Sequence, residues 1–385
     1  MDPDLFNETP FGRPVRTKGP HGYWYFSPQE LPRQLDLPPP TVKLAANAAA
    51  ALGHLAGIGK LVPNPHLLIQ PYISQEALAS SRIEGTEASM SDVLEAQNQE
   101  IVVGPVREVT NYIKAFEYGL ARLDALPVSR RFLCEVHKHL LDGARGNERQ
   151  PGHVRQSQNW IGGVDVVSAR FVPPVVDEVT PLLDDLERYI HSGDEVMLPD
   201  LVQLALLHYQ FETIHPFLDG NGRLGRLLIT FLLVEREILP TPLLYLSAWF
   251  ERHKQEYYDH LQAVRERGEV IEWVDFFLRG ITQMSTEAVA QAEQLVDLEA
   301  DFRKRLQGDR SRAIEVIDLI MEVPLVTTAR IASKLGTSPQ TSLNYVNTLV
   351  KLEVLREVRS PGRGKRWIAP EVYENLVPGG APDFA

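Results

Sequence analysis

The sequence predicts a mainly all-α fold with one small β element in the middle of the chain. Apolar residues recur at helical spacing along most of the 385 residues. Residues 143–174 depart from this pattern, because eight Gly or Pro residues there separate short β-like pieces. A chain of this length exceeds one ordinary core, so two or three domains are expected.

The composition is that of a folded, water-soluble protein, with 44% hydrophobic and 23% charged residues. A net charge of −12 argues against nucleic-acid binding over the whole surface, but it does not exclude a local basic module. The single cysteine, Cys134, excludes an internal disulfide and a cysteine-based zinc site. No signal peptide is visible, and the longest strongly apolar run near the centre, Leu227–Val234, is far shorter than the ~20 residues of a membrane span. We therefore expect a cytoplasmic protein with no membrane partner.

The N-terminal third divides into two expected parts. Residues 1–40 are rich in Pro, Gly and aromatic residues and are expected to form an irregular arm. Residues 41–126 are expected to form a helical region, which begins with an alanine-rich helix. The helices in it are expected at 41–59, at 71–85, from Ser89 or Ser91 to Glu100, and at 106–126.

The central region, residues 127–285, combines helices with the β element. A helix is expected at 129–141, and residues 143–174 are expected to form a β-hairpin or flap. The further helices are expected at 176–192, 199–213, 223–238, 251–267 and 272–278. A charged helical linker at 286–309 then leads to the last domain.

The segment His215–Arg226 carries the strongest chemical pattern, His-Pro-Phe-Leu-Asp-Gly-Asn-Gly-Arg-Leu-Gly-Arg. Pro216 disfavours the α region for His215, so the preceding helix has to end there. Gly220 and Gly222 allow positive φ and a close approach of the backbone to a ligand. Free amides at the start of the next helix then form a site for an anion.

Four side chains of this segment support an anionic ligand. Arg223 and Arg226 are expected on one face of the first turn, where positive charge is unfavourable unless an anion lies between them. A polyphosphate fits this arrangement, and Asp219 is suited to bind its Mg²⁺. His215 is able to take a proton from a hydroxyl at neutral pH. A His-Pro or an Asp-Gly-Asn-Gly alone is usually a helix end or a turn, but the combination is far more specific.

This segment resembles the signature of Fic proteins: His-Pro-Phe, any residue, Asp or Glu, Gly-Asn-Gly-Arg, two residues, then Arg. Every specified position is present, and the resemblance covers roughly residues 70–285. It implies a Fic-type helical core with a flap, in which residues 127–285 form the catalytic domain. The implied ATP-binding residues are Pro216, Phe217, Leu218, Asp219, Gly220, Asn221, Gly222, Arg223, Arg226 and, in an adenine pocket, Tyr257 with Tyr258 beside it.

The resemblance implies an adenylyltransferase that moves AMP from ATP, with Mg²⁺, to a Ser, Thr or Tyr hydroxyl of a target protein. His215 is the implied general base, and Asp219 is the implied Mg²⁺ ligand. The residues from Gly220 to Gly222, with the Asn221 side chain, are expected to hold the α- and β-phosphates. Arg223 steadies the phosphates, and Arg226 holds the γ-phosphate.

The flap is implied to dock the target by strand pairing. The residues expected at its centre are Asn159, Trp160, Ile161, Gly162 and Gly163.

A second stretch, Ser80-Ser81-Arg82-Ile83-Glu84-Gly85, ends a predicted helix. Negative charge is disfavoured at a helix C-terminus, and a solvated Glu there is the ordinary interpretation. Fic proteins, however, carry an inhibitory helix with Ser or Thr, three residues, Glu, then Gly or Asn. Ser80, Glu84 and Gly85 match it. The resemblance implies that Glu84 pairs with Arg226 and inhibits the enzyme, or that it positions water for removal of AMP.

Residues 310–375 resemble a winged helix-turn-helix, and 376–385 form a tail. Helices are expected at 311–321, 328–335 and 339–352, and β pieces at 355–358 and 366–369. Residues 311–370 contain nine Lys or Arg and five Asp or Glu, a net charge of +4 in an acidic chain. DNA binding and protein docking or dimerisation both fit this module.

Two further interpretations stay open at this point. The same pocket is able to transfer a different phosphate-containing group. Alternatively, the chain is chiefly a DNA-binding regulator with a nucleotide-sensing Fic-like part, although a sensor has no need of His215. A homodimer is compatible with the resemblance, and the sequence does not identify the target protein.

Overall fold

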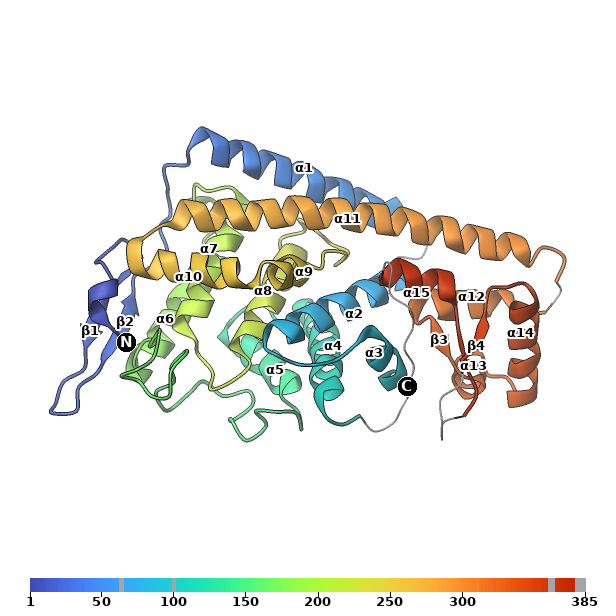
Figure 1. Ribbon diagram of the computed structural model, residues 1–385. Helices are drawn as coiled ribbons and strands as arrows, with labels where there is room; N and C mark the ends of the chain where they lie inside the picture. Colours follow the sequence, from blue (N-terminus) through green and yellow to red (C-terminus); the bar gives the residue numbers. More distant parts are fainter. Residues whose placement is uncertain (62–65, 99–101, 310, 359–363, 378–385) are drawn as a thin grey trace.

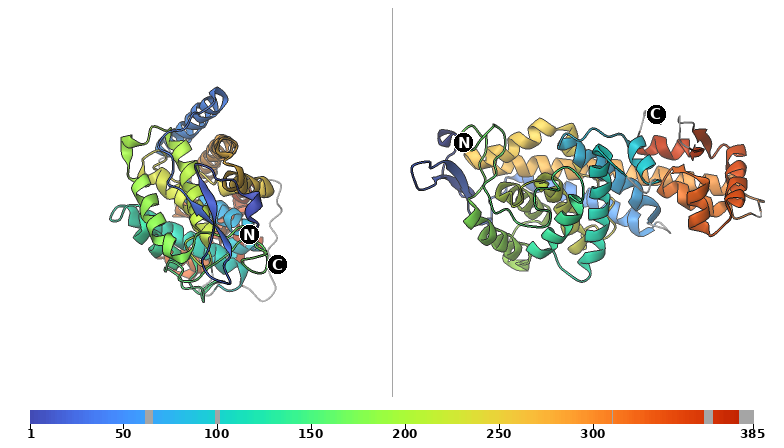
Figure 2. Two further views of the ribbon diagram at one scale, coloured as in Figure 1. Left: turned by 90° about the vertical axis from the view of Figure 1, so that its left-hand side faces the viewer. Right: turned by 90° about the horizontal axis from the view of Figure 1, so that it is seen from below.

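The protein is an elongated helical body that carries a small C-terminal module at one end (Figures 1 and 2). The computed structural model describes residues 1–61, 66–98, 102–309, 311–358 and 364–377. The mainly helical fold predicted from the sequence is confirmed. In the part of the chain described, no helix is both long and apolar enough to span a bilayer.

The N-terminal arm contains regular structure that the sequence analysis did not predict. After the short 3-10 turn η1 (Pro3–Leu5), strands β1 (Gly12–Arg16) and β2 (Trp24–Pro28) pair antiparallel. The expectation of a wholly irregular arm is therefore wrong. Gly and Pro are depleted in strands, so composition concealed this hairpin. Burial of Phe26 against Phe171 stabilises it on the flap.

Two long helices lie side by side along one edge of the body, α1 (Pro39–Leu61) and α11 (Val270–Arg305) (Figure 1). The sequence pattern predicted a helix at 272–278 and a separate helical linker at 286–309, but α11 is one continuous helix. Gly280 lies in the middle of this helix. A Cβ at this position would lie only 2.5 Å from the Trp249 ring, so no larger residue fits without a shift. Close packing, and not a break in the helix, accounts for this glycine.

Four helices form the rest of the N-terminal half and the first part of the central region. They are α2 (His66–Ile83), α3 (Met90–Ala96), α4 (Pro105–Leu123) and α5 (Arg130–Leu140). α2 begins earlier than predicted and contains Pro71. Ser89 caps α3 in a capping box with Asp92, so the first of the two predicted capping residues is the correct one.

The helices that position the site are α7 (Asp200–Ile214) and α8 (Asn221–Glu235), which are buried at nearly every position. Around them lie α6 (Val176–Ile190), the short turn η2 (Gly193–Glu195), α9 (Ser247–Arg252) and α10 (Lys254–Arg267). Both helices are thus buried on all sides and lie in the core. The loop between α7 and α8 is therefore held by two rigid elements.

The predicted flap is present as one antiparallel bridge, Ile161 to Phe171, with bends and turns in place of regular strands. Gly162 and Gly163 both have positive φ, 69° and 76°. This conformation turns the chain out of the extended region and ends the pairing.

Among its described residues, the C-terminal module has four helices and a three-stranded sheet of order β3-β5-β4. Its elements are α12 (Ile314–Glu322), β3 (Leu325–Val326), α13 (Thr328–Leu335), α14 (Pro339–Lys351), β4 (Arg356–Val358), β5 (Arg366–Ile368) and α15 (Pro370–Leu376). The helix α15 was not predicted. Residues 359–363 of the predicted basic loop, and 378–385 of the predicted tail, lie outside the described residues. One contiguous apolar core joins the module to the body.

Candidate active site

The loop between α7 and α8 begins with a strained residue. His215 ends α7 in the left-handed region, at φ 49° and ψ 59°. This conformation is uncommon for a residue other than Gly and persists where the surroundings enforce it. Pro216 removes the continuing helix, as the sequence predicted. The result is a sharp turn that separates His215 from the axis of α7.

The side chain of Asn221 closes the loop on itself. Its Oδ1 accepts a hydrogen bond from Phe217 N at 2.9 Å, and its Nδ2 donates to Phe217 O at 2.8 Å. Asn221 is also only 2% exposed. Both of its polar atoms are thus engaged with the loop backbone. In this state the side chain shapes the loop, in contrast to the phosphate contact expected from the resemblance.

Two flap residues hold the loop from the other side. Arg155 donates from Nε to His215 O at 3.0 Å, and Asn159 donates from Nδ2 to Phe217 O at 2.9 Å. Arg155 is 1% exposed, and burial lowers its pKa to about 10. The flap and the loop therefore form one rigid unit.

His137 on α5 is a further loop contact, which sequence reasoning missed. Its ring stacks on Phe217 with centroids 3.9 Å apart. Gly152 N donates to His137 Nδ1, so Nε2 carries the proton and donates to Asp219 O at 2.9 Å. Burial lowers the pKa of His137 to about 4, which keeps the ring neutral. No local sequence pattern marks this residue, because its partners lie far away in the chain.

His215 itself is neutral at physiological pH. Burial, followed by the positive charges of Arg265 and Arg155, lowers its pKa to about 3. Its Nδ1 lies 3.4 Å from Glu212 O. A neutral imidazole is able to accept a proton, and the negative charge of a bound phosphate would raise the pKa toward the useful range.

Arg223 in the first turn of α8 is buried with unused hydrogen-bonding capacity. The side chain is 1% exposed, and its guanidinium lies 3.6 Å from Glu108 Oε2 and 3.6 Å from Asp219 Oδ1. Both distances exceed a hydrogen bond. Among the residues described, Nε and Nη1 have no hydrogen-bond partner. Buried donors without partners reduce the stability of the folded protein, so this arrangement fits a site that binds an anion.

Asp219 presents a carboxylate at the same place. Gly220 N donates to its Oδ1 at 2.6 Å, and 36% of the side chain is exposed. No cluster of three or more His, Cys, Asp or Glu able to hold a metal occurs in the described part of the chain. A single carboxylate beside a phosphate site nevertheless suits Mg²⁺, which keeps several waters and takes phosphate oxygens as ligands. The residues present therefore fit a nucleotide-bound Mg²⁺.

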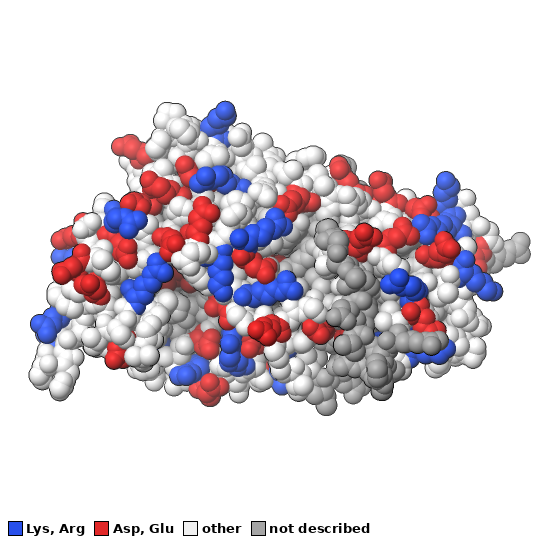
Figure 3. Space-filling view, in the orientation of Figure 1, with Lys and Arg blue, Asp and Glu red and all other residues white. Residues whose placement is uncertain are grey.

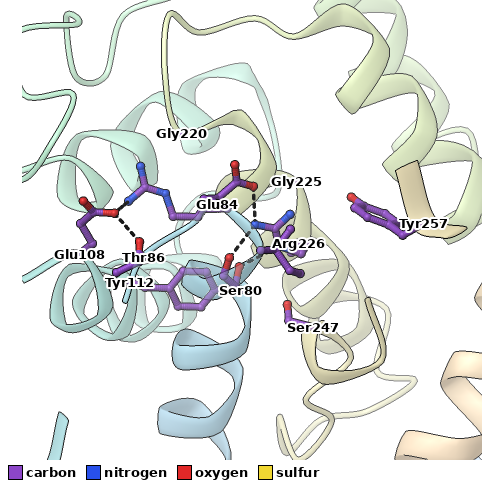
Figure 4. Close-up of polar contacts among 12 residues, drawn as sticks. Ser80, Glu84, Thr86, Glu108, Tyr112, Gly220, Gly225, Arg226, Ser247 and Tyr257 are labelled. Atoms are coloured by element: carbon purple, nitrogen blue, oxygen red, sulfur yellow. Dashed lines mark hydrogen bonds and ion pairs between the residues drawn. The ribbon is translucent and has the colours of Figure 1, made fainter. Parts of the chain in front are cut away.

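Arg226 is held by the end of α2 (Figure 4). It donates from Nε to Ser80 Oγ at 2.8 Å and from Nη2 to Ser80 O at 2.9 Å. The same Nη2 lies 2.7 Å from Glu84 Oε1, and Arg226 is 2% exposed. Burial favours the neutral forms, but the mutual attraction outweighs it and lowers the pKa of Glu84 and raises that of Arg226. Both groups stay charged.

The Glu84 carboxylate also lies against the start of α8. A Cβ placed on Gly222 would be 2.2 Å from Glu84 Oε1. The positive end of a helix dipole and its free amides attract anions at this position. Glu84 thus occupies space at the anion site that a phosphate group would otherwise use. Only a glycine at position 222 permits this approach.

Two models of known protein families match this chain. Residues 42–121 match the Fic/DOC family N-terminal model, and residues 127–233 match the Fic/DOC family model. The chain is thus similar to the Fic/DOC family over residues 42–121 and 127–233. The second match covers α7, the loop after it and α8 as far as residue 233.

Curated relatives are named Protein adenylyltransferase Fic. The one from Aedes aegypti is 26% identical over 209 residues, which are 52% of this chain and 39% of that protein. The one from Drosophila yakuba is 28% identical over 170 residues, 44% of this chain and 31% of that protein. This chain thus spans less than two fifths of the length of these relatives. The name adenylyltransferase describes the activity of those relatives.

A solved structure has the same fold over most of the chain. The crystal structure of a Fic family protein from Desulfovibrio desulfuricans G20 aligns with a TM-score of 0.57 at 24% identity. It covers 87% of this chain and 97% of that one. A Fic domain containing signaling protein from Bacteroides thetaiotaomicron VPI-5482 aligns with a TM-score of 0.51 at 18% identity. At these identities the likeness concerns the fold alone.

Tyr257, on α10, lies in the buried core and not on an open surface. It is 1% exposed, and its hydroxyl lies 2.8 Å from His208 Nε2. Its ring stacks on Phe250 with centroids 4.5 Å apart. Tyr258 is half-buried and nearer to the end of α2, since its hydroxyl lies 3.5 Å from Ile83 O. Helical periodicity alone could not predict that Tyr257 is fully buried and that Tyr258 is only half-buried.

Of the flap residues expected to dock a target, those from Trp160 to Gly163 lie on the outside of the site, whereas Asn159 contacts the loop. Trp160 is 42% exposed, and Ile161 pairs with Phe171 on one side. Beyond them Val164 and Val167 are 87% and 74% exposed. Of the remaining predicted loop residues, Pro216 is buried and Leu218 is half-buried.

Proposed function

We propose that this protein transfers AMP from ATP to a hydroxyl side chain of a target protein. The observation that carries the proposal is Arg223, a buried arginine with two unpartnered nitrogens at the start of α8. It lies in the same loop-helix unit as the neutral His215. A cationic site for phosphates and a proton acceptor beside it are what transfer of a nucleotide to a hydroxyl requires.

In this mechanism the target hydroxyl attacks the α-phosphorus of ATP in line. His215 takes the hydroxyl proton, the new bond from oxygen to phosphorus forms, and the bond to pyrophosphate breaks. The amides of Gly220 to Gly222 and the guanidinium of Arg223 stabilise the phosphate charge. Arg226, once free of Glu84, holds the γ-phosphate. Positioning and charge stabilisation thus supply most of the catalysis.

Asp219 is the proposed Mg²⁺ ligand. Its partly exposed carboxylate is the acidic group of the loop itself. Bound Mg²⁺ would neutralise charge on the phosphates. The Asp219 carboxylate is kept in place by Gly220 N and, through the main-chain carbonyl, by His137.

Glu84 is proposed to inhibit the enzyme. Its ion pair with Arg226 and its position over Gly222 support this role, because both would prevent a γ-phosphate from binding there. The alternative use, positioning of water for removal of AMP, involves the same carboxylate. AMP release from a modified target by the wild-type protein, and not by Glu84→Gly, distinguishes the two.

The flap is proposed to dock an extended target segment. Residues 159–163 pair with Phe171 through one edge only, at Ile161. An added strand supplies main-chain hydrogen bonds to an open edge. Asn159 links this edge to the Phe217 carbonyl and so fixes the distance from target to loop.

The first experiment uses purified Glu84→Gly protein with Mg²⁺ and ATP labelled on the α- or the γ-phosphate. Label on protein from the α-position only, absent in Glu84→Gly with His215→Ala, is the expected result. Label from the γ-position only identifies a phosphotransferase. No label from either position contradicts the proposal and favours a nucleotide sensor.

The C-terminal module is proposed to bind nucleic acid as a winged helix. Gln340, Asn344 and Asn347 are exposed on α14, and amide side chains of this kind hydrogen-bond to base edges. The helical body in Figure 3 shows basic and acidic side chains intermixed, which does not suit a nucleic-acid surface. The local net charge of +4 in 311–370 makes the module the better candidate. Protein docking, homodimerisation and a cytoplasmic location stay predictions of the sequence analysis.

A further inference from the structure

A cleft of about 830 Å³ lies between α3 and the C-terminal module. Its walls are the first turns of α13 and α14, the beginning of β5, and the end of α3. Thr328 lines the cleft at the start of α13, Gln340 lines it at the start of α14, and Glu95 lines it from α3. Two helix N-termini that face one cleft make it favourable for an anion.

Arg366 is the second, independent feature of this cleft that favours an anion. The residue is 6% exposed, and its Nη1 donates to Glu95 Oε1 at 2.5 Å. Its Nε and Nη2 have no hydrogen-bond partner within the described ranges. The exposed Lys365 lines the same cleft. Arg366 is therefore buried with unused hydrogen-bond donors, and Glu95 is its partner in the cleft. This arrangement suits a polyanion.

Glu95 is the one acidic side chain among the described residues that line the cleft. It neutralises Arg366 and repels any phosphate that approaches. The relationship is the same as that of Glu84 to Arg226 at the other site. The two glutamates belong to one continuous segment of the chain, from the end of α2 to the end of α3.

We propose that double-stranded DNA binds this cleft through a phosphate on Arg366, and that Glu95 competes with it. DNA binding and docking of α3 then exclude each other. The proposal for catalytic regulation rests on the proposed AMP transfer and its inhibition by Glu84. A duplex is favoured over a small anion, since Gln340 lines the cleft at the start of α14 and the same helix exposes the amide side chains of Asn344 and Asn347.

The segment between the two glutamates is short and held at several points. Thr86 Oγ1 donates to Glu108 Oε2 at 2.7 Å, and Glu108 in turn faces Arg223. Arg82 donates to Ala88 O at 2.9 Å, and Ser89 caps α3. These contacts transmit a displacement of α3 to Glu84, because no long flexible link intervenes. Release of α3 by DNA is expected to weaken the ion pair of Glu84 with Arg226.

Binding free energies are coupled reciprocally, so the Glu84→Gly variant should itself bind DNA more tightly than wild type. Likewise, DNA should make AMP transfer by the wild-type protein faster and leave the released Glu84→Gly variant unchanged.

The test measures binding of a fluorescent 24-base-pair duplex to the full chain by anisotropy, for wild type, Glu95→Gln and Glu315→Gln. Glu315 pairs with the exposed Arg312 away from the cleft, so its variant makes the same charge change. Glu95→Gln is expected to bind about fivefold more tightly or better, with a salt dependence steeper by about one ion. Glu315→Gln should stay within about twofold of wild type. Equal affinities of the two variants, or no binding by either, would overturn the proposal.

A second measurement does not depend on catalysis. Hydrogen exchange of residues 80–96 should become faster when wild-type protein is saturated with the duplex, and circular dichroism verifies that each variant is folded. Unchanged exchange in a protein that binds DNA overturns the coupling. If exchange responds but Glu84→Gly transfers no AMP, the proposed function fails while the DNA site stands.

Discussion

Glu84 Oε1 lies 2.7 Å from Arg226 Nη2 and in the space directly over Gly222. One carboxylate therefore neutralises the second arginine of α8 and blocks the amide end of the same helix. A phosphate group needs both features. The contact is intramolecular, so it competes with ATP at every ATP concentration.

The first prediction is that Glu84→Gly raises AMP transfer. A hydrogen bond between charged groups contributes about 1.5–3 kcal/mol, so its loss should raise the rate about 10- to 150-fold. Auto-modification with α-labelled ATP measures the change. Glu87→Gly is the matched control, because Glu87 is exposed three residues further on in the same connection. A similar rate for both variants would show that removal of any Glu here, and not release of Arg226, is responsible.

The second prediction concerns His137, which positions the loop without being in the signature. His137→Leu removes the partner of Asp219 O and Gly152 N. Each unpaired buried group costs about 1–3 kcal/mol, so both stability and transfer should fall. Raising Mg²⁺ should restore part of the activity in the Glu84→Gly background, since Asp219 is the group displaced.

His139→Leu provides the comparison for this variant. His139 lies on the same helix, and its ring contacts the Tyr118 ring, at a tilted angle, instead of the loop. The loop role of His137 is contradicted if the two variants lose stability equally and neither responds to Mg²⁺.

The sequence predicted the helix end at His215 and the start of the next helix near Arg223, because Pro216 and Gly220 act through their own backbones. It could not predict the Asn221 side chain, since the same residue fits a phosphate contact or a loop closure. The choice depends on the geometry of Phe217, which is a tertiary property.

Gly280 illustrates the opposite difficulty. A glycine in a helical pattern suggests a break, and only the proximity of Trp249 explains its presence inside α11. The strands at the N-terminus were missed for a related reason, because their pairing is stabilised by burial on a flap that is distant in sequence.

The third prediction is a pH dependence of stability caused by Glu212. Burial, with Glu84 adding to it and Arg226 and Arg265 opposing it, raises the pKa of Glu212 from 4.5 to about 7. Below pH 4.5 both folded and unfolded chains hold the proton. Between pH 4.5 and 7 only the folded chain holds it, so stability falls as pH rises through this window and then levels off. The loss is about 3 kcal/mol.

Glu212→Gln removes this titration, so the variant should be more stable than wild type at pH 8 and nearly equal to it at pH 4.5. Urea unfolding at the two pH values measures the difference. Glu293→Gln, at an exposed position of α11, should change neither value by more than about 0.5 kcal/mol. A constant difference between Glu212→Gln and wild type across pH argues against a raised pKa.

The last prediction separates a core tyrosine from a nucleotide contact. Tyr257→Phe removes the hydrogen bond to His208 Nε2 in a site that is 1% exposed. The unpaired ring nitrogen should cost about 1–3 kcal/mol of unfolding free energy, while KM for ATP in the Glu84→Gly background stays the same. Tyr258→Phe should cost little stability, because its hydroxyl lies 3.5 Å from Ile83 O, at the limit of a hydrogen bond. Thermal unfolding and the ATP dependence of auto-modification, measured on both variants, decide the matter. A raised KM in a stable Tyr257→Phe protein would return Tyr257 to the adenine pocket, and it would require the core around α10 to open when ATP binds.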